Sequence, residues 1–173
     1  EIGCQMKLAV IPARGGSKRI PRKNVKTFHG KPMIGYAIEA ALASNVFGRV
    51  IVSTDDAEIA EVAKAYGAET PFIRPAELAD DHTPTVPVIA HAIKSCISLG
   101  WNVDEVCCIY PGVPFISTED LRCAHEQLVT SGAHYVFPIT SFPSPIQRAL
   151  RRLPDGRVQP FHPEHAATRT QDL

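Results

Sequence analysis

The sequence predicts an α/β fold in which a mainly parallel sheet carries helices on both faces. Short apolar runs alternate regularly with longer segments whose apolar residues recur at helical spacing. Capping residues or glycines mark the ends of these longer segments. The chain has 173 residues, of which 45% are hydrophobic and 21% charged, which suits a compact domain with its own core.

The expected strands are short apolar runs. They lie at residues 8–11, 50–52, 71–73, 106–110 and 135–139. In a sheet of this kind ligands bind beyond the carboxyl ends of the strands. The loops that follow Ile11, Ile73 and Tyr110 are therefore expected to share one face.

The expected helices cover residues 32–44, 55–66, 85–99 and 117–131. Pro32 suits a first helical turn because its φ is already close to the helical value. Asp55 with Glu58, and Ser117 with Asp120, resemble capping pairs. The glycines expected to end the last three helices are Gly67, Gly100 and Gly132.

The domain organisation is predicted to be simple. Residues 1–5 precede Met6 and are interpreted as a tag or upstream extension with no role, and residues 6–173 are expected to form a single domain. Asp155-Gly156 predicts a hairpin turn near the end of the chain.

The composition argues against several classes of protein. The formal net charge is zero, so neither a nucleic acid nor a membrane partner is indicated, and no apolar run has the length of a membrane span. The five cysteines include no Cys-x-x-Cys pair, which argues against a disulfide framework or a structural zinc site. A reducing cytoplasm is expected.

Basic residues cluster near the N-terminus, where residues 7–38 hold eight Lys or Arg and no Asp or Glu. Within this stretch the loop 12–24 follows the first strand directly. Gly15 and Gly16 allow a tight turn with N–H groups facing a ligand, and Arg14, Lys18 and Lys23 add the charge that a triphosphate needs. The spacing is neither that of a Walker loop nor that of a dinucleotide fingerprint. The alternative interpretation is an ordinary solvated basic loop.

The run IPARGGSK at residues 11–18, continued at 20–24, resembles the signature of the sialic acid cytidylyltransferase family. Further similar runs lie at residues 30–33, 52–56, 74–79 and 83–85. Residues 107–111 and 140–149 resemble the pseudaminic acid branch of that family.

The resemblance implies a three-layer α/β/α fold of the nucleotide-diphospho-sugar transferase type, which is Rossmann-like. It also implies a reaction in which the anomeric hydroxyl of a nine-carbon nonulosonic acid attacks the α-phosphate of CTP and releases pyrophosphate. Pseudaminic acid is the expected acceptor, with sialic or legionaminic acid as alternatives. Mg²⁺ is the implied cofactor, and a homodimer the implied assembly.

Site residues carry over from the matching motifs. Arg14 and Lys23 are implied to be catalytic, and Tyr110 and Arg169 to face the sugar. The residues implied to bind the nucleotide are Ala13, Arg14, Gly15, Gly16, Ser17, Lys18, Asn24, Arg74 and Thr83. Simpler structural roles stay open: Arg74 as a surface ion-pair partner, Tyr110 as a core residue and Asn24 as a turn cap.

The chain departs from the family pattern in two places. Residues 111–114 read Pro-Gly-Val-Pro where the family usually has Pro-Thr-Ala-Pro. The family's metal-binding aspartates and dimer-forming region are expected beyond Leu173, so no metal ligand is assigned within the chain. A nucleotide-binding module without turnover, or a domain that only binds partners, are therefore the other classes considered.

Overall fold

The computed structural model describes residues 6–173, so the interpretation of residues 1–5 lies outside the described residues. The chain separates into two compact units, one ending at Val136 and the other formed by Phe137–Leu173. Each is described by itself below, as unit 1 and unit 2.

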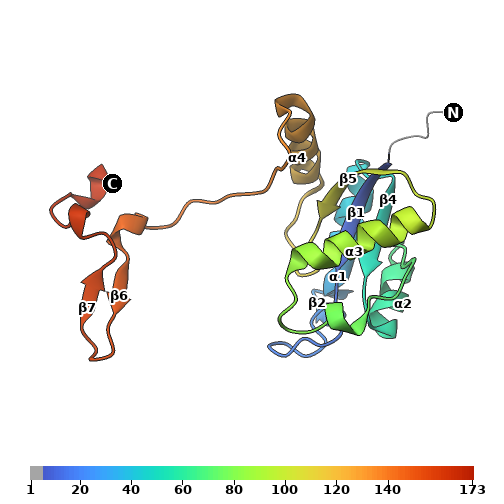
Figure 1. Cartoon of the computed structure of the whole chain (residues 1–173), viewed down its shortest axis with the longest axis horizontal. Helices are drawn as coiled ribbons and strands as arrows, with labels where there is room; N and C mark the ends of the chain where they lie inside the picture. The colour runs from blue at the N-terminus through green and yellow to red at the C-terminus, as the bar shows by residue number, and fades with distance from the viewer. Residues whose placement is uncertain (1–5) are drawn as a thin grey trace. The chain divides into compact units, whose positions relative to one another are not determined.

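Unit 1 is built on a three-stranded parallel sheet with the order β4-β1-β5 (Figure 1). The strands are β1 (Met6–Pro12), β4 (Arg49–Ser53) and β5 (Val103–Cys108). Val10 lies in the centre of the sheet, opposite Ile51 on one side and Cys108 on the other. The predicted parallel sheet is thus confirmed.

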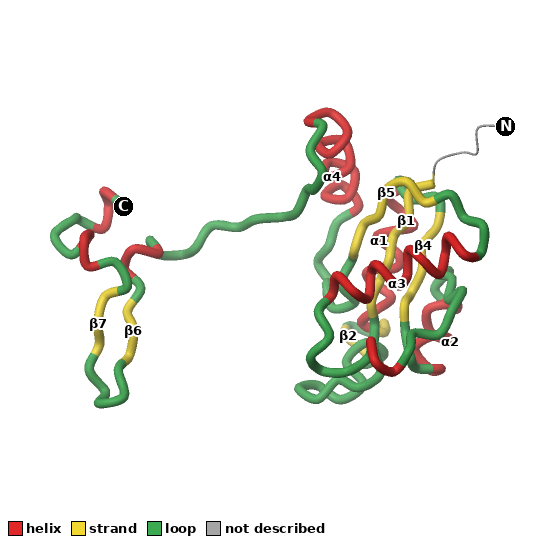
Figure 2. Tube along the Cα trace, viewed as in Figure 1, coloured by secondary structure: helices red, strands yellow, loops and turns green. Residues whose placement is uncertain are grey.

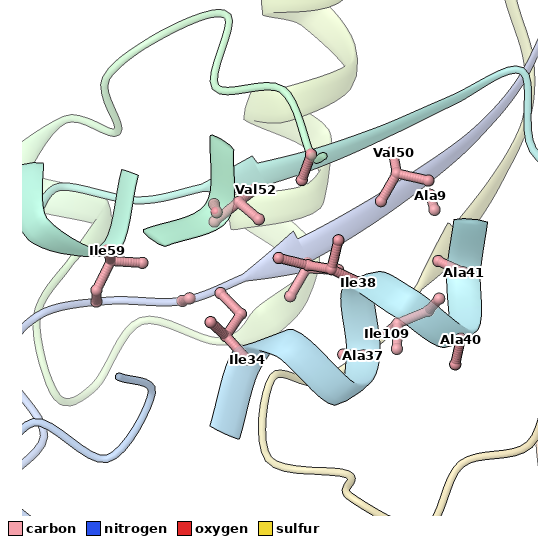
Figure 3. Close-up of a cluster of buried hydrophobic side chains, with 14 of the residues drawn as sticks. Ala9, Ile34, Ala37, Ile38, Ala40, Ala41, Val50, Val52, Ile59 and Ile109 are labelled. Atoms are coloured by element: carbon pink, nitrogen blue, oxygen red, sulfur yellow. The ribbon is translucent and has the colours of Figure 1, made fainter. Parts of the chain in front are cut away.

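Alternate residues of β1 enter two separate cores, as the two-residue period of a strand requires. Ala9 and Ile11 pack with residues of the helices α1 (Met33–Ser44), α2 (Ala57–Ala65) and α4 (Thr118–Ser131). Leu8 and Val10 pack with Ala92 and Cys96 of the helix α3 (Thr85–Ser98). Figure 3 shows the first core, and Figure 1 shows α3 across the opposite face of the sheet. The arrangement is the predicted three-layer α/β/α fold.

Four helices surround the sheet. They are α1 (Met33–Ser44), α2 (Ala57–Ala65), α3 (Thr85–Ser98) and α4 (Thr118–Ser131). The Ser117 hydroxyl accepts the N–H of Asp120 and so caps α4 as predicted, and Gly132 ends that helix with a left-handed residue. None of these helices is long and apolar enough to cross a membrane, nor is any other helix of residues 6–173.

Short elements complete the two units. In unit 1, β2 (Thr27–Phe28) pairs with β3 (Lys31–Pro32), and a 3₁₀ turn covers Ala76–Leu78. In unit 2, β6 (Leu150–Arg152) and β7 (Val158–Pro160) form the hairpin predicted from Asp155-Gly156 (Figure 2). Three 3₁₀ turns of unit 2 lie at Ile146–Arg148, Pro163–His165 and Thr170–Asp172.

Two predicted strands are wrong. Residues 71–73 are not a strand. The segment that follows α2 pairs with β4 only at the bridge of Glu69 to Ile51, and Pro71 lacks the N–H that would extend this ladder. Residues 135–139 form an apolar run but lie mostly exposed and find no neighbouring strand among residues 6–173. An apolar run alone does not make a strand without a partner edge.

The predicted cap of α2 is displaced by one residue. Asp56, not Asp55, accepts the N–H of Ile59 at 3.0 Å and is the N-cap. Asp55 is therefore free for another role at the end of β4.

Candidate functional site

The carboxyl ends of the three parallel strands carry the segments that hold most of the predicted site residues. Backbone hydrogen bonds join these segments beyond the sheet: Ala13 N–H donates to the Ser53 carbonyl at 3.0 Å, and Arg74 N–H to the Thr54 carbonyl at 2.9 Å. The loop after β1 and the segment 74–84 are thereby held on either side of β4. The segments that follow Ile11 and Ile73 therefore meet at the carboxyl end of β4, as expected for loops that share one face of the sheet.

The two glycines of the loop after β1 have different surroundings. Gly15 donates its N–H to Asp55 Oδ1 at 3.0 Å, and a Cβ at this position would lie 2.5 Å from Asp56 Oδ2. Gly15 is thus required by the close approach of the segment that follows β4. A Cβ at Gly16 would meet no described atom within 4 Å. No protein neighbour explains the absence of a side chain at Gly16, so its open face is available to a ligand.

Arg14 and Lys18 converge on one carboxylate. Arg14 Nη1 lies 2.6 Å from Asp81 Oδ1, while Lys18 Nζ pairs with Asp81 Oδ2. The hydrogen bonds from Lys18 and then Arg14 hold the pKa of Asp81 below its usual value. Each cation therefore contacts one of the two oxygens of a single anion. Two oxygens of a phosphate group could be contacted in the same way.

Lys23 and Asn24 lie at the far end of the same loop. Asn24 is 4% exposed, and its Nδ2 donates to the carbonyl of Arg14 at 3.0 Å. Its Oδ1 is buried without a hydrogen-bond partner in the described part of the chain. Lys23 is half-buried, and within residues 6–173 no carboxylate pairs with its amine. The Asn24 amide therefore links the two ends of the loop, and its contact with a nucleotide stays a prediction.

Arg22 connects this end of the loop to the start of α2 through ion pairs. Its guanidinium reaches both oxygens of Asp56, at 2.5 and 3.1 Å, and also pairs with Glu58. The hydrogen bond from Arg22 is the main reason that the pKa of Asp56 is lowered to about 2.

Arg74 lines an open cleft of about 570 Å³ beside this loop. The other residues that line the cleft are Asp55, Ile73, Pro75, Ala76, Ala79 and Asp80. Arg74 is 4% exposed, and its Nε donates to Ser53 Oγ at 3.1 Å while a terminal nitrogen donates to the Ser53 carbonyl. Burial lowers the pKa of Arg74, Asp55 opposes that shift and Arg14 adds to it. Arg74 is thus buried, so the alternative in which it is a surface ion-pair partner is wrong, and its contact with a nucleotide stays a prediction.

Thr83 and Tyr110 both lie near the start of α3, the first just before it in the chain and the second through a contact with Thr85. The Thr83 hydroxyl donates to Asp80, one of the cleft residues, at 2.6 Å. The Tyr110 hydroxyl lies 3.0 Å from the Thr85 hydroxyl, and Tyr110 is 56% exposed. The alternative in which Tyr110 is a core residue is therefore wrong.

The remaining predicted residues divide between the two units. Ala13 is buried at the end of β1, and Ser17 donates its backbone N–H to the Gly15 carbonyl at 3.0 Å. Arg169 lies in unit 2, where it forms an exposed ion pair with Asp172 at 2.6 Å. Its contact with a sugar stays a prediction.

Three residues of this site were missed by reasoning from sequence: Asp55, Asp81 and Arg22. The position of Asp55, directly after a buried strand, was a usable signal, but its apparent role as a helix cap concealed it. No local pattern connects Asp81 or Arg22 to their partners, since these pairs join segments far apart in the sequence.

No cluster of metal-ligating side chains is found in the described part of the chain. Among residues 6–173 no group of three or more His, Cys, Asp or Glu side chains is placed to hold one.

The comparisons with known proteins cover the segments that form this candidate site. A family model described as "Cytidylyltransferase" matches residues 8–147, which include every candidate residue except Arg169. The chain belongs to the cytidylyltransferase family. The resemblance of its N-terminal loop to this family is thereby confirmed.

Several cytidylyltransferases are similar over most of the chain. The pseudaminic acid cytidylyltransferase of Campylobacter jejuni serotype O:2 is 44% identical over 166 residues, which cover 96% of this chain and 72% of that protein. The CMP-N,N'-diacetyllegionaminic acid synthase of Legionella pneumophila is 39% identical, over 79% of this chain and 60% of that protein.

Solved structures show the same fold. A CMP:2-keto-3-deoxy-manno-octonic acid synthetase complexed with CTP superposes with a TM-score of 0.62 at 26% identity, covering 73% of this chain. A cytidylyltransferase of Leptospira borgpetersenii gives a TM-score of 0.57 at 23% identity. The chain spans about half the length of these two structures.

Proposed function

We propose that this cytidylyltransferase transfers CMP from CTP to pseudaminic acid and releases pyrophosphate. The observation that carries the proposal is the convergence of Arg14 and Lys18 on a single carboxylate, beside the open face of Gly16. The 44% identity to a pseudaminic acid cytidylyltransferase supports the choice of acceptor. The legionaminic acid synthase at 39% identity supports the nearest alternative acceptor.

In the proposed complex the triphosphate takes the place of Asp81 against Arg14 and Lys18. A phosphate carries more charge than a carboxylate and presents more oxygens, so it competes well for the same two cations. Lys23, whose amine has no partner in residues 6–173, is then available to the α-phosphate. The sugar hydroxyl loses its proton to water and its oxygen forms a new bond to the α-phosphorus, as the bond from that phosphorus to pyrophosphate breaks. Positioning and charge neutralisation are the contributions that such a displacement needs from the protein.

The nucleoside is proposed to occupy the cleft at Arg74. Arg74 and Thr83 supply polar groups suited to the edge of cytosine, and Asn24 Oδ1 is a buried acceptor suited to a ribose hydroxyl. Tyr110 is proposed to face the sugar, and Arg169 to pair with its carboxylate.

Mg²⁺ is proposed to accompany CTP. Residues 6–173 do not fit a dedicated metal site, because no group of three His, Cys, Asp or Glu side chains gathers there, and Asp55 is hydrogen-bonded to Gly15 and Asp56 to Arg22 and Ile59. We therefore assign Mg²⁺ no ligand among these residues and no step of the reaction.

The assembly is proposed to be a homodimer, and the compartment the cytoplasm. Four cysteines of the described chain are free thiols, which suits a reducing compartment where CTP is also available. Sedimentation of the purified protein tests the dimer, and a monomer at micromolar concentration would contradict it.

The decisive experiment measures pyrophosphate release from CTP and Mg²⁺ by the intact protein. Pseudaminic, legionaminic and sialic acids are compared at equal concentration. We expect pyrophosphate release with pseudaminic acid, at a higher kcat/KM than with legionaminic or sialic acid. No release with any of them would reject cytidylyl transfer, and a preference for sialic acid would reject the proposed acceptor.

A further inference from the structure

The turn that presents Lys23 begins at a residue in an unusual backbone conformation. Arg22 has a φ of 54°, in the left-handed region that L-residues other than glycine seldom adopt. Its carbonyl accepts the N–H groups of Val25 at 3.1 Å and Lys26 at 2.9 Å, and the Lys23 N–H donates to the Ile20 carbonyl at 3.2 Å. The direction in which Lys23 leaves the backbone therefore depends on the conformation held at Arg22.

The side-chain contacts of Arg22 stabilise this backbone conformation. Its two terminal nitrogens contact the two oxygens of Asp56, and one of them also pairs with Glu58. Asp56 is itself held in place, since it accepts the Ile59 N–H at 3.0 Å and donates its own N–H to the Thr54 hydroxyl at 3.1 Å. Arg22 thus connects the loop to a rigid helix start at the end of β4.

The residue on the other side of Lys23 is fixed as well. Asn24 is buried, donates from its side chain to the carbonyl of Arg14, and accepts the Ile34 N–H at 2.9 Å on its own carbonyl. Lys23 therefore lies between two anchored neighbours. Its own amine is held by no carboxylate of residues 6–173, so the backbone on either side sets its position.

We propose that Arg22 is a positioning residue, which keeps Lys23 directed at the triphosphate through its pairing with Asp56 and Glu58. This inference rests on the proposed function, in which Lys23 acts on the α-phosphate. The guanidinium of Arg22 is already engaged by two carboxylates and does not itself contact CTP. Arg22 therefore influences turnover rather than nucleotide affinity.

The test is a double-mutant cycle in the intact protein. Arg22→Met is expected to lower kcat about tenfold, the scale on which small displacements of a reacting group act, and to leave the dissociation constant of CTP within about twofold. In a Lys23→Met background the same substitution is expected to have no further effect on kcat. Asp56→Asn keeps an N-cap acceptor but removes the charge facing Arg22, so it should reproduce most of the Arg22→Met loss.

The matched control is Arg19→Met. Arg19 is an exposed cation of the same loop and makes no ion pair within residues 6–173, so kcat should be unchanged. Equal losses of kcat in the wild-type and Lys23→Met backgrounds would overturn the inference. A weaker affinity for CTP at unchanged kcat would also overturn it, because Arg22 would then be a nucleotide contact.

Amide hydrogen exchange gives a readout that does not need turnover. Exchange of the Lys23 N–H is expected to be at least about fivefold faster in Arg22→Met and unchanged in Arg19→Met, because the turn around Lys23 opens more often. Unchanged exchange in Arg22→Met overturns the positioning role. Faster exchange supports it whether or not pyrophosphate is released, and the absence of release then counts against the proposed function alone.

Discussion

Gly15 and Gly16 are neighbours that should respond very differently to alanine. A methyl group at Gly15 would lie 2.5 Å from Asp56 Oδ2 and 3.0 Å from Asp56 Cβ, distances at which atoms cannot remain. Asp56 cannot move freely, because it caps α2 and pairs with Arg22. A methyl group at Gly16 would meet nothing within 4 Å among the described residues, and the φ of Gly16 is not in the left-handed region.

The cost of Gly15→Ala follows from the interactions that Asp56 loses when it gives way. A helix cap contributes about 1 kcal/mol, and the half-exposed pair with Arg22 contributes up to about 1 kcal/mol. The expected loss is therefore about 1–2 kcal/mol, or a decrease in Tm of about 2–8 °C for a protein of this size. Gly16→Ala is expected to change stability by less than about 0.5 kcal/mol.

Thermal unfolding and CTP titration calorimetry together separate the two glycines. Gly15→Ala should lower Tm. Gly16→Ala should keep the wild-type Tm. If the backbone at Gly16 approaches the phosphates as proposed, this variant should bind CTP about fivefold or more weakly. A decrease in Tm for Gly16→Ala that matches that of Gly15→Ala would refute this reasoning, as would unchanged CTP binding by Gly16→Ala.

Three further predictions concern carboxylates and the buried arginine. Asp81→Asn is expected to tighten CTP binding a few-fold in calorimetry, because Arg14 and Lys18 no longer have to leave a carboxylate, and weaker binding would contradict this. Arg74→Met should lower the free energy of unfolding by about 2 kcal/mol, because the buried Ser53 carbonyl loses a charged donor, and it should also weaken CTP binding; a wild-type denaturation midpoint would contradict the first part. The pKa of Asp56 is about 2 in the folded protein against an ordinary value of 3.8, so its ion pair stabilises the fold above about pH 4 and is lost as the pH falls toward 2. Asp56→Asn should flatten acid unfolding in that window, and an acid limb identical to that of the wild type would reject the assignment.

The fold was largely predictable because its signals are local. Apolar runs, the Ser117 cap and the turn at Asp155-Gly156 each act over a few residues, and the structure confirms them. The expected strands at 71–73 and 135–139 were wrong because a strand depends on a partner edge, which no short sequence pattern reveals. The family was predictable for a different reason, since the loop after β1 carries an unusually specific run of residues.

The ion pairs between the basic loop and its carboxylates were beyond prediction from sequence. Asp81 pairs with Arg14 and Lys18, and Asp56 with Arg22, only because the fold brings the ends of β1 and β4 and the segment after Arg74 together. The basic loop looked like a set of free cations in the sequence. In the structure Arg14, Lys18 and Arg22 are paired with carboxylates. Arg19 and Lys23 pair with no carboxylate of residues 6–173.

Backbone amide shifts during a CTP titration test the nucleotide site most directly. If the loop after β1 binds the triphosphate, the largest changes should fall on Gly15, Gly16 and Lys18, with a second group at Arg74 and Thr83. Changes confined to other parts of the chain, or none at millimolar CTP, would contradict a triphosphate site in this loop.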